Sequence, residues 1–120
     1  MTKSDLAWAG GFLDGEGCFQ FVRSGGTYRG SIEVEQRNPT NLYVLQRILG
    51  GVGTVRPRRG RKAHRFRVTA GGEVLIVLQK VMPYLAFKYP EAQQLRRGLT
   101  TTDPRIEESC AKEIRRLKRR

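Results

Sequence analysis

Two carboxylates separated by glycines are the residues whose types and spacing best suit chemistry. Asp14 and Glu16 alternate with Gly15 and Gly17 and follow an apolar stretch, residues 6–13, whose spacing predicts a helix. Both carboxylates then fall at the C-terminal end of that helix, where negative charge opposes the helix dipole. A bound cation or a polar interface would account for two acids in such a place.

The predicted helix has one face with almost no side-chain bulk. The bare positions, which recur at i, i+3, i+4 and i+7, are Ala7, Gly10, Gly11 and Asp14. Each interior glycine costs about 1 kcal/mol relative to alanine, whereas small residues let a second helix approach closely. The sequence holds no second copy of this stretch, so we predict a homodimer in which this face meets its symmetry mate across a two-fold axis. The alternative is that the two glycines simply end a short helix.

A two-fold axis beside this helix would bring the two copies of Glu16 together. Two like charges about 4 Å apart repel by roughly 4 kcal/mol at an effective dielectric constant of 20. A divalent cation would relieve that repulsion. The sequence therefore indicates a metal-binding role for Glu16 at the predicted interface.

The rest of the chain alternates between the periodicities of strands and helices. Strands are expected at about residues 18–24, 28–37, 52–58 and 63–70, and helices at about 5–16, 39–49, 73–82, 91–98 and 104–120. We expect Ser4 to cap the first helix and Asn38 the second, and the glycine pair 71–72 to break the fourth strand. This order predicts an α+β fold, with helices on one face of a four-stranded antiparallel sheet and further helices at the C-terminus.

Alternation along the predicted strands separates an apolar sheet face from a polar one. The apolar side chains expected under the helices include Phe19, Phe21, Ile32, Val34, Val55, Phe66 and Val68. The opposite face collects Gln20, Ser24, Glu33, Arg56, Arg58, Arg65 and Arg67.

The predicted hairpin at residues 56–67 is strongly basic and includes Arg61 in its turn. A two-stranded ribbon fits the major groove of DNA, where arginine reads guanine with two hydrogen bonds. The alternative is a solvated hairpin that keeps the protein soluble. Glu33 and Glu35 lie among these arginines, and they would either accept from cytosine or pair with arginines on neighbouring strands.

The whole chain is basic, with a formal net charge of +12 over 120 residues. Such a charge favours a polyanionic partner, most often nucleic acid, and a membrane surface is the alternative. We find no apolar run of the roughly 20 residues that a membrane span needs and no signal peptide, and we expect an intracellular protein with Cys18 and Cys110 reduced. Residues 112–120 are expected to contact phosphates or to be partly disordered, with only Ile114 and Leu117 to anchor them.

Residues 9–17, Ala-Gly-Gly-Phe-Leu-Asp-Gly-Glu-Gly, resemble the LAGLIDADG motif of homing endonucleases, with Ala9 in place of the first leucine. The expected order of elements also resembles the αββαββα unit of that family, over about residues 4–99. The resemblance implies a saddle-like sheet, an endonuclease core domain at residues 1–99, and a basic C-terminal helix or tail at residues 100–120. It also implies a homodimer that cuts both strands of a long, near-palindromic double-stranded DNA site across the minor groove, with no membrane or small-molecule partner.

The resemblance implies three catalytic residues. Glu16 matches the family's metal-binding acid, helped by the backbone carbonyl of Gly15, with Mg2+ or another divalent cation as cofactor. Gln36 matches a polar residue that organises water, and Lys88 matches a lysine that would stabilise charge developing on the phosphate. The alternative is a non-cleaving relative that acts as an intron RNA maturase or a DNA-binding regulator.

The sequence departs from the family pattern in two places. Pro90 and Glu91 stand where the family usually has a second lysine and a glutamine after Lys88. Thr40 stands where the family often has a basic residue, and Arg37 would substitute for it.

Overall fold

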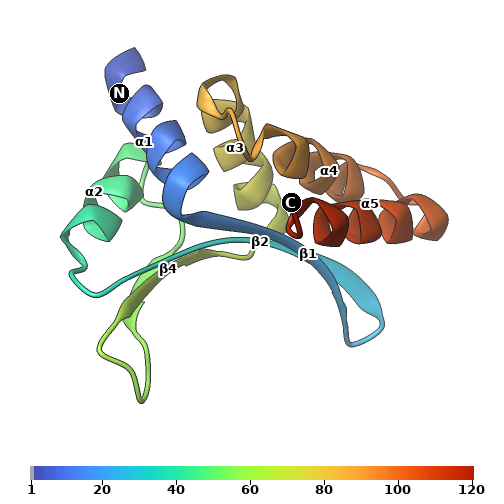
Figure 1. Cartoon of the computed structure of the whole chain (residues 1–120), viewed down its shortest axis with the longest axis horizontal. Coiled ribbons are helices and arrows are strands. Elements are labelled where there is room, and N and C mark those ends of the chain that lie inside the picture. The colour runs from blue at the N-terminus through green and yellow to red at the C-terminus, as the bar shows by residue number, and fades with distance from the viewer. Residues whose placement is uncertain (1) are drawn as a thin grey trace.

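The computed structural model describes residues 2–120 and shows an arched sheet under a layer of helices (Figure 1). Its elements are α1 (Lys3–Glu16), β1 (Gly17–Ser24), β2 (Thr27–Gln36), α2 (Thr40–Ile48), β3 (Thr54–Pro57), β4 (His64–Val68), α3 (Gly71–Val81), a 3-10 turn η1 (Met82–Tyr84), α4 (Tyr89–Thr100) and α5 (Pro104–Leu117). The predicted α+β fold is confirmed. Among the residues described, no helix has the length and apolar character needed to cross a membrane.

The four strands lie in the order β1-β2-β4-β3, and each neighbouring pair is antiparallel. The β1–β2 hairpin turns through Gly25 and Gly26, whose φ values of 60° and 85° lie in the left-handed region that glycine adopts without strain. Figure 1 shows all five helices on the convex side of the arch. The concave side therefore presents the outward side chains of the strands.

Strand alternation builds the core as the sequence predicted. Phe19, Ile32 and Phe66 point toward the helices and are fully buried. Ala9 and Leu13 of α1 are also fully buried, which fixes the motif helix to the rest of the domain. Truncating one of these aromatic side chains to alanine should cost about 3–5 kcal/mol, because the packed core would be left with a cavity.

Helix α4 lies unusually close to the sheet because one of its residues is glycine. A Cβ added at Gly98 would lie 2.5 Å from the ring of Phe21 in β1. A larger residue at this position would push α4 away from the strand that follows the motif helix.

Helix α5 belongs to the same core. Its buried residues are Cys110, Ala111 and Ile114. Within residues 112–120 Ile114 is buried and Leu117 half-buried, and the buried face of α5 extends one turn further back, to Cys110. The basic end of the chain is thereby held against β1 and α4.

Several predicted boundaries were wrong. Thr2, not Ser4, caps α1: its Oγ1 accepts from the Asp5 amide at 3.0 Å, and Asp5 Oδ2 accepts from the Thr2 amide at 3.2 Å. The glycine pair at 71–72 does not end the fourth strand but begins α3, and β4 ends earlier, at Val68.

Candidate active site and nucleic-acid surface

Glu16 and Gln36 come together at one end of the sheet. Gly17 of β1 pairs with Val34 of β2, so the last residue of α1 lies beside the last residues of β2. Gln36 Nε2 donates to Glu16 Oε2 at 3.4 Å. The exposed carboxylate of Glu16 is thus held by one weak hydrogen bond and remains open to solvent.

Lys88 reaches the same end of α1 from the start of α4. Its ammonium Nζ donates to the backbone carbonyl of Asp14 at 2.7 Å, and its backbone amide donates to Asp14 Oδ1 at 2.8 Å. The carbonyl that binds the ammonium belongs to the residue two positions before Glu16. The ammonium therefore lies at the C-terminal end of α1, where the carbonyl dipoles carry negative charge. The structure brings all three expected catalytic residues to the end of α1.

Asp14 anchors the segment that carries Lys88. Its carboxylate accepts from the amides of Ala86 and Phe87, each at 3.1 Å, as well as from Lys88. Burial raises the pKa of Asp14, but these three amides and the nearby ammonium outweigh it, so the pKa lies below its ordinary value. Asp14 was predicted to lie at a subunit interface, whereas in the structure its carboxylate has three amide partners within the chain.

The bare face of α1 is narrower than predicted. Gly10 is buried, and a Cβ there would lie 2.5 Å from Tyr84 Cβ, so its small size serves a contact within the chain. A Cβ added at Gly11 would meet nothing within 4 Å, and Ala7 is exposed. The helix continues through both glycines to Glu16, which excludes the alternative that they end it.

An aromatic pair borders the open part of this face. Trp8 and Phe12 stack with ring centroids 5.1 Å apart, and Trp8 is 37% exposed. With Ala7 and Gly11 they form an open face of α1 that combines small residues and apolar rings, a combination suited to close helix contact.

The concave face of the sheet carries arginines paired with glutamates. Glu33 accepts from Arg65 Nη1 at 3.5 Å and forms an ion pair with Arg67, whose Nε lies 3.2 Å from Glu33 Oε2. Glu35 accepts from Arg61 Nη1 at 3.2 Å and lies 3.6 Å from Arg58 Nε. Of the two interpretations of these glutamates, the structure shows the one in which they pair with arginines.

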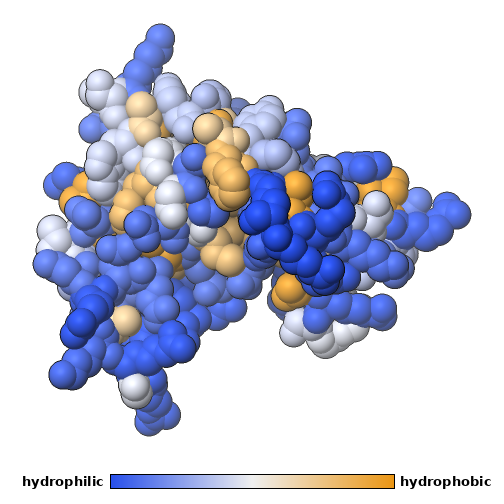
Figure 2. All heavy atoms as spheres, viewed as in Figure 1, coloured by the Kyte–Doolittle hydropathy of each residue, from blue (hydrophilic) through white to orange (hydrophobic). Residues whose placement is uncertain are grey.

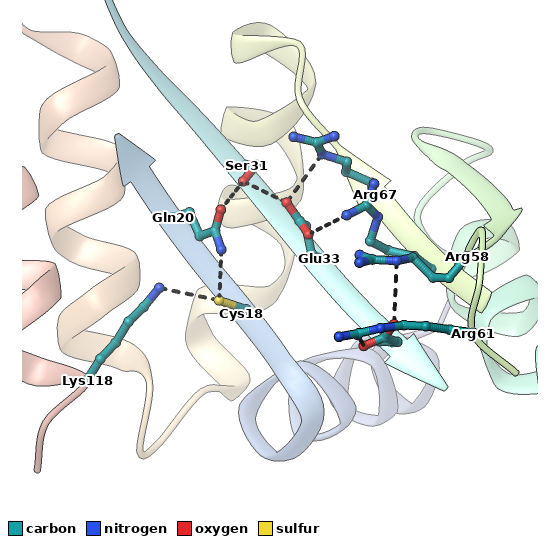
Figure 3. A network of polar contacts seen from close by, with 10 residues as sticks. Cys18, Gln20, Ser31, Glu33, Arg58, Arg61, Arg67 and Lys118 are labelled. Atoms are coloured by element: carbon teal, nitrogen blue, oxygen red, sulfur yellow. Dashed lines mark hydrogen bonds and ion pairs between the residues drawn. The ribbon is translucent and has the colours of Figure 1, made fainter. Parts of the chain in front are cut away.

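The polar contacts continue across the sheet to α5 (Figure 3). Ser31 Oγ donates to Gln20 Oε1 at 3.3 Å and lies 3.4 Å from Glu33 Oε2. Gln20 Nε2 and Lys118 Nζ both approach Cys18 Sγ, at 3.5 and 3.3 Å. Lys118 was not among the predicted surface residues, because nothing local in the sequence indicates that α5 ends beside β1.

The remaining predicted surface residues lie at the margins of the concave face. Arg56 lies opposite Arg65 in the β3–β4 pair and forms no ion pair within residues 2–120. Ser24 lies at the tip of the first hairpin, opposite Thr27. The face is therefore basic at its β3–β4 side and polar but less charged along β1.

One chain alone offers few ligands for a metal ion. Within residues 2–120 no cluster of three or more His, Cys, Asp and Glu residues is placed to hold one. The exposed carboxylate of Glu16 and the backbone carbonyl of Gly15 are hard oxygen donors of the type that Mg2+ and Ca2+ prefer. They fit a divalent cation only as part of a larger donor set.

Comparison with curated proteins identifies a clear relative, whereas no family model matches the chain. The chain is 33% identical over 114 residues to the DNA endonuclease I-CvuI of Chlorella vulgaris, an alignment that covers 84% of this chain and 70% of the relative.

Solved structures agree with this relationship. A crystal structure of the homing endonuclease I-CvuI, with a target DNA that is not cleaved in the presence of Mg, matches with a TM-score of 0.80 and 29% identity over 96% of this chain and 82% of that one. The same enzyme with its target and Ca matches with a TM-score of 0.77. The archaeal intron-encoded homing endonuclease I-Vdi141I, complexed with DNA, shares the fold at 16% identity and a TM-score of 0.79 over 97% of this chain and 83% of that one.

Proposed function

Because the chain belongs to the LAGLIDADG homing endonuclease family, we propose that it is a site-specific endonuclease that hydrolyses both strands of double-stranded DNA with the help of a divalent cation. The observation that carries the proposal is the meeting of Glu16, Gln36 and Lys88 at the end of α1, beside a basic sheet face. These residues come from three elements far apart in the sequence, and the side chains of Glu16, Gln36 and Lys88 lie outside the hydrophobic core.

DNA binding is assigned to the concave face. Figure 2 shows hydrophilic residues over most of the molecule in this view, with the surface hollowed beneath the arch. The arginines of the β3–β4 hairpin point outward there. Glu33 pairs with Arg65 and Arg67 of β4, and Glu35 pairs with Arg58 and Arg61 of the hairpin loop, which restricts the orientations of these arginines. A guanidinium group whose orientation is restricted is better suited to bidentate hydrogen bonds with a guanine edge than a guanidinium group that moves freely.

The active unit is a homodimer. One chain supplies a single exposed carboxylate at the proposed metal site, and cutting two strands requires two such centres. The open face of α1, with Ala7, Trp8 and Gly11, is the surface on which a second copy would pack. A two-fold axis there would bring two copies of Glu16 and Gly15 together and enlarge the donor set.

Each residue of the site has a separate task. Glu16 and the Gly15 carbonyl would bind the divalent cation, Mg2+ or another, which when bound lowers the pKa of water and stabilises charge on phosphate oxygens. Gln36 donates to Glu16 and would orient both that carboxylate and the attacking water. Lys88 would stabilise negative charge that develops on the scissile phosphate.

The test is cleavage of a randomised plasmid library by the purified protein with Mg2+, followed by sequencing of the breaks. We expect a recurrent site, and we expect Glu16→Gln to abolish cutting while retaining DNA affinity, since it removes the metal-binding charge and keeps the shape. Recurrent binding without breaks in the unmodified protein would instead identify a non-cleaving regulator. Cutting at unmodified rates by the Glu16→Gln variant would overturn the metal assignment.

A further inference from the structure

The segment that carries Lys88 is held by two other parts of the chain. Asp14 of α1 accepts from the amides of residues 86–88. Arg120, which follows the end of α5, makes the second set of contacts. The guanidinium of Arg120 stacks over the ring of Phe87, 4.2 Å from its centroid, and donates to the Phe87 carbonyl.

Arg120 also pairs with a buried acid. Glu91 stands three residues after Lys88, in the first turn of α4, and its side chain is only 4% exposed. Arg120 Nη2 lies 3.5 Å from Glu91 Oε1, and it is the ion-pair partner of Glu91 within the described residues. A buried carboxylate is retained only if it is paired or hydrogen-bonded, so this contact is difficult to exchange for water.

The geometry of these contacts is specific to arginine. One planar group stacks on an aromatic ring, donates to a carbonyl and pairs with a carboxylate. An ammonium is compact and cannot stack by its face, so lysine would not reproduce the three contacts together. Arg120 therefore fixes the residue before Lys88 and the residue one turn after it.

We propose that Arg120 is a positioning residue for Lys88: it holds residues 87–91 so that the lysine ammonium stays at the end of α1 beside Glu16. The inference rests on the role that the proposed function gives Lys88. Arg120 itself would touch neither the metal nor the reacting phosphate. Its effect on cleavage would pass entirely through Lys88, which distinguishes it from a phosphate contact or a simple anchor for α5.

The first experiment does not depend on cleavage. Amide hydrogen exchange is measured in the full chain for the unmodified protein, Arg120→Ala, Arg120→Lys and Arg119→Ala. Arg119 is exposed and adjacent, so its variant removes the same charge without touching Phe87 or Glu91. We expect exchange at Phe87 and Lys88 to become about tenfold faster in both Arg120 variants and to stay unchanged in Arg119→Ala. Equal protection in all four proteins would overturn the inference.

The second experiment separates catalysis from binding. We expect Arg120→Ala to slow single-turnover cleavage by about 10–100-fold, while its DNA affinity equals that of Arg119→Ala. In a Lys88→Met background, Arg120→Ala should slow cleavage no further, since the two residues act as a unit. A full additional loss in that background, or unchanged cleavage with faster exchange, would overturn the positioning role. Failure of the unmodified protein to cut any DNA would count against the proposed function alone. The exchange measurement would still show whether Arg120 holds the segment around Lys88.

Discussion

Asp14 and Lys88 lie 74 residues apart in the chain and are joined twice. The lysine amide donates to the aspartate carboxylate at 2.8 Å, and the lysine ammonium donates to the aspartate carbonyl at 2.7 Å. Each residue therefore contributes both its side chain and its backbone. The motif helix and the start of α4 are therefore joined by two hydrogen bonds at the proposed active site.

Replacing Asp14 should destabilise the fold in a pH-dependent way. At pH 7 Asp14→Asn should lower the free energy of unfolding by about 1–3 kcal/mol, since charged acceptors make the stronger hydrogen bonds. The folded pKa of Asp14 lies below the ordinary value of 3.8. Its contribution is therefore fully present above that value and is lost as the pH falls through the folded pKa.

The measurement is urea unfolding of Asp14→Asn and the unmodified protein from pH 7 down to pH 3. The difference between the two curves should narrow as the pH falls below 3.8. Glu73→Gln, which removes an exposed carboxylate in the first turn of α3, serves as the control and should show a much smaller difference. A gap for Asp14→Asn that stays constant over the whole range would contradict the assignment.

Adjacent glycines in α1 should respond in opposite ways. Gly10→Ala places a Cβ 2.5 Å from Tyr84 Cβ and should cost about 1–3 kcal/mol of stability. A Cβ at Gly11 meets nothing within 4 Å in its own chain, so Gly11→Leu should keep the helical content and convert the dimer to a monomer. Circular dichroism and light scattering separate the two effects. A monomeric unmodified protein on its DNA would refute the dimer.

Sequence preference should reside in the hairpin arginines and not in the end of the chain. Arg58→Ala and Arg67→Ala should each lose about 1–3 kcal/mol of binding and relax preference at one or two base pairs. Arg119→Ala should weaken binding to all sequences alike and reduce the salt slope by about 1. Binding to randomised half-sites checks this, and identical preferences in all three variants would mean that the hairpin supplies only charge.

Removing the charge of Glu33, which pairs with two arginines on the concave face, should lower sequence specificity and raise the affinity for DNA in general. Glu33→Gln releases Arg65 and Arg67 and adds one positive charge, so binding to random DNA should tighten and its salt slope should steepen by about 1. Discrimination between half-sites should fall. Glu35→Gln is the control matched in charge, because it also adds one positive charge but releases Arg58 and Arg61. It should steepen the salt slope to the same extent and leave the preferences that depend on Arg65 and Arg67 unchanged. Loss of preference at a single cytosine, with arginine-dependent preferences intact, would mean that Glu33 reads DNA directly.

The alternation of the strands could be predicted from the sequence because it is local. Phe19, Ile32 and Phe66 alternate with polar neighbours, and that pattern alone determines which face is buried. The motif at residues 9–17 points to Glu16 and, through the family resemblance, to Gln36 and Lys88, and the structure brings these three to the end of α1. The capping box at Thr2 is also local, but Ser4 offers an equally good capping side chain two residues later, so the sequence alone does not choose between them.

Features that the sequence did not predict depend on contacts between distant segments. Tyr84 occupies the space beside Gly10, and Glu91 pairs with Arg120. No periodicity or spacing within either segment records such a pairing. For the same reason the bare helix face was predicted to be wholly intermolecular, although Gly10 and Asp14 make their contacts within the chain.

The sharing of Glu33 by Arg65, Arg67 and Ser31 has a consequence for how a protein of this kind changes its target over evolution. The outward side chains have no part in the core, so they are free to vary without unfolding the domain. Because one acid orients two arginines, however, a single exchange disturbs its neighbours as well. New DNA-sequence preferences should therefore arise through several coupled substitutions in this group of residues. A variant with only one of these substitutions should discriminate between DNA sites less well than the original protein or the fully substituted one.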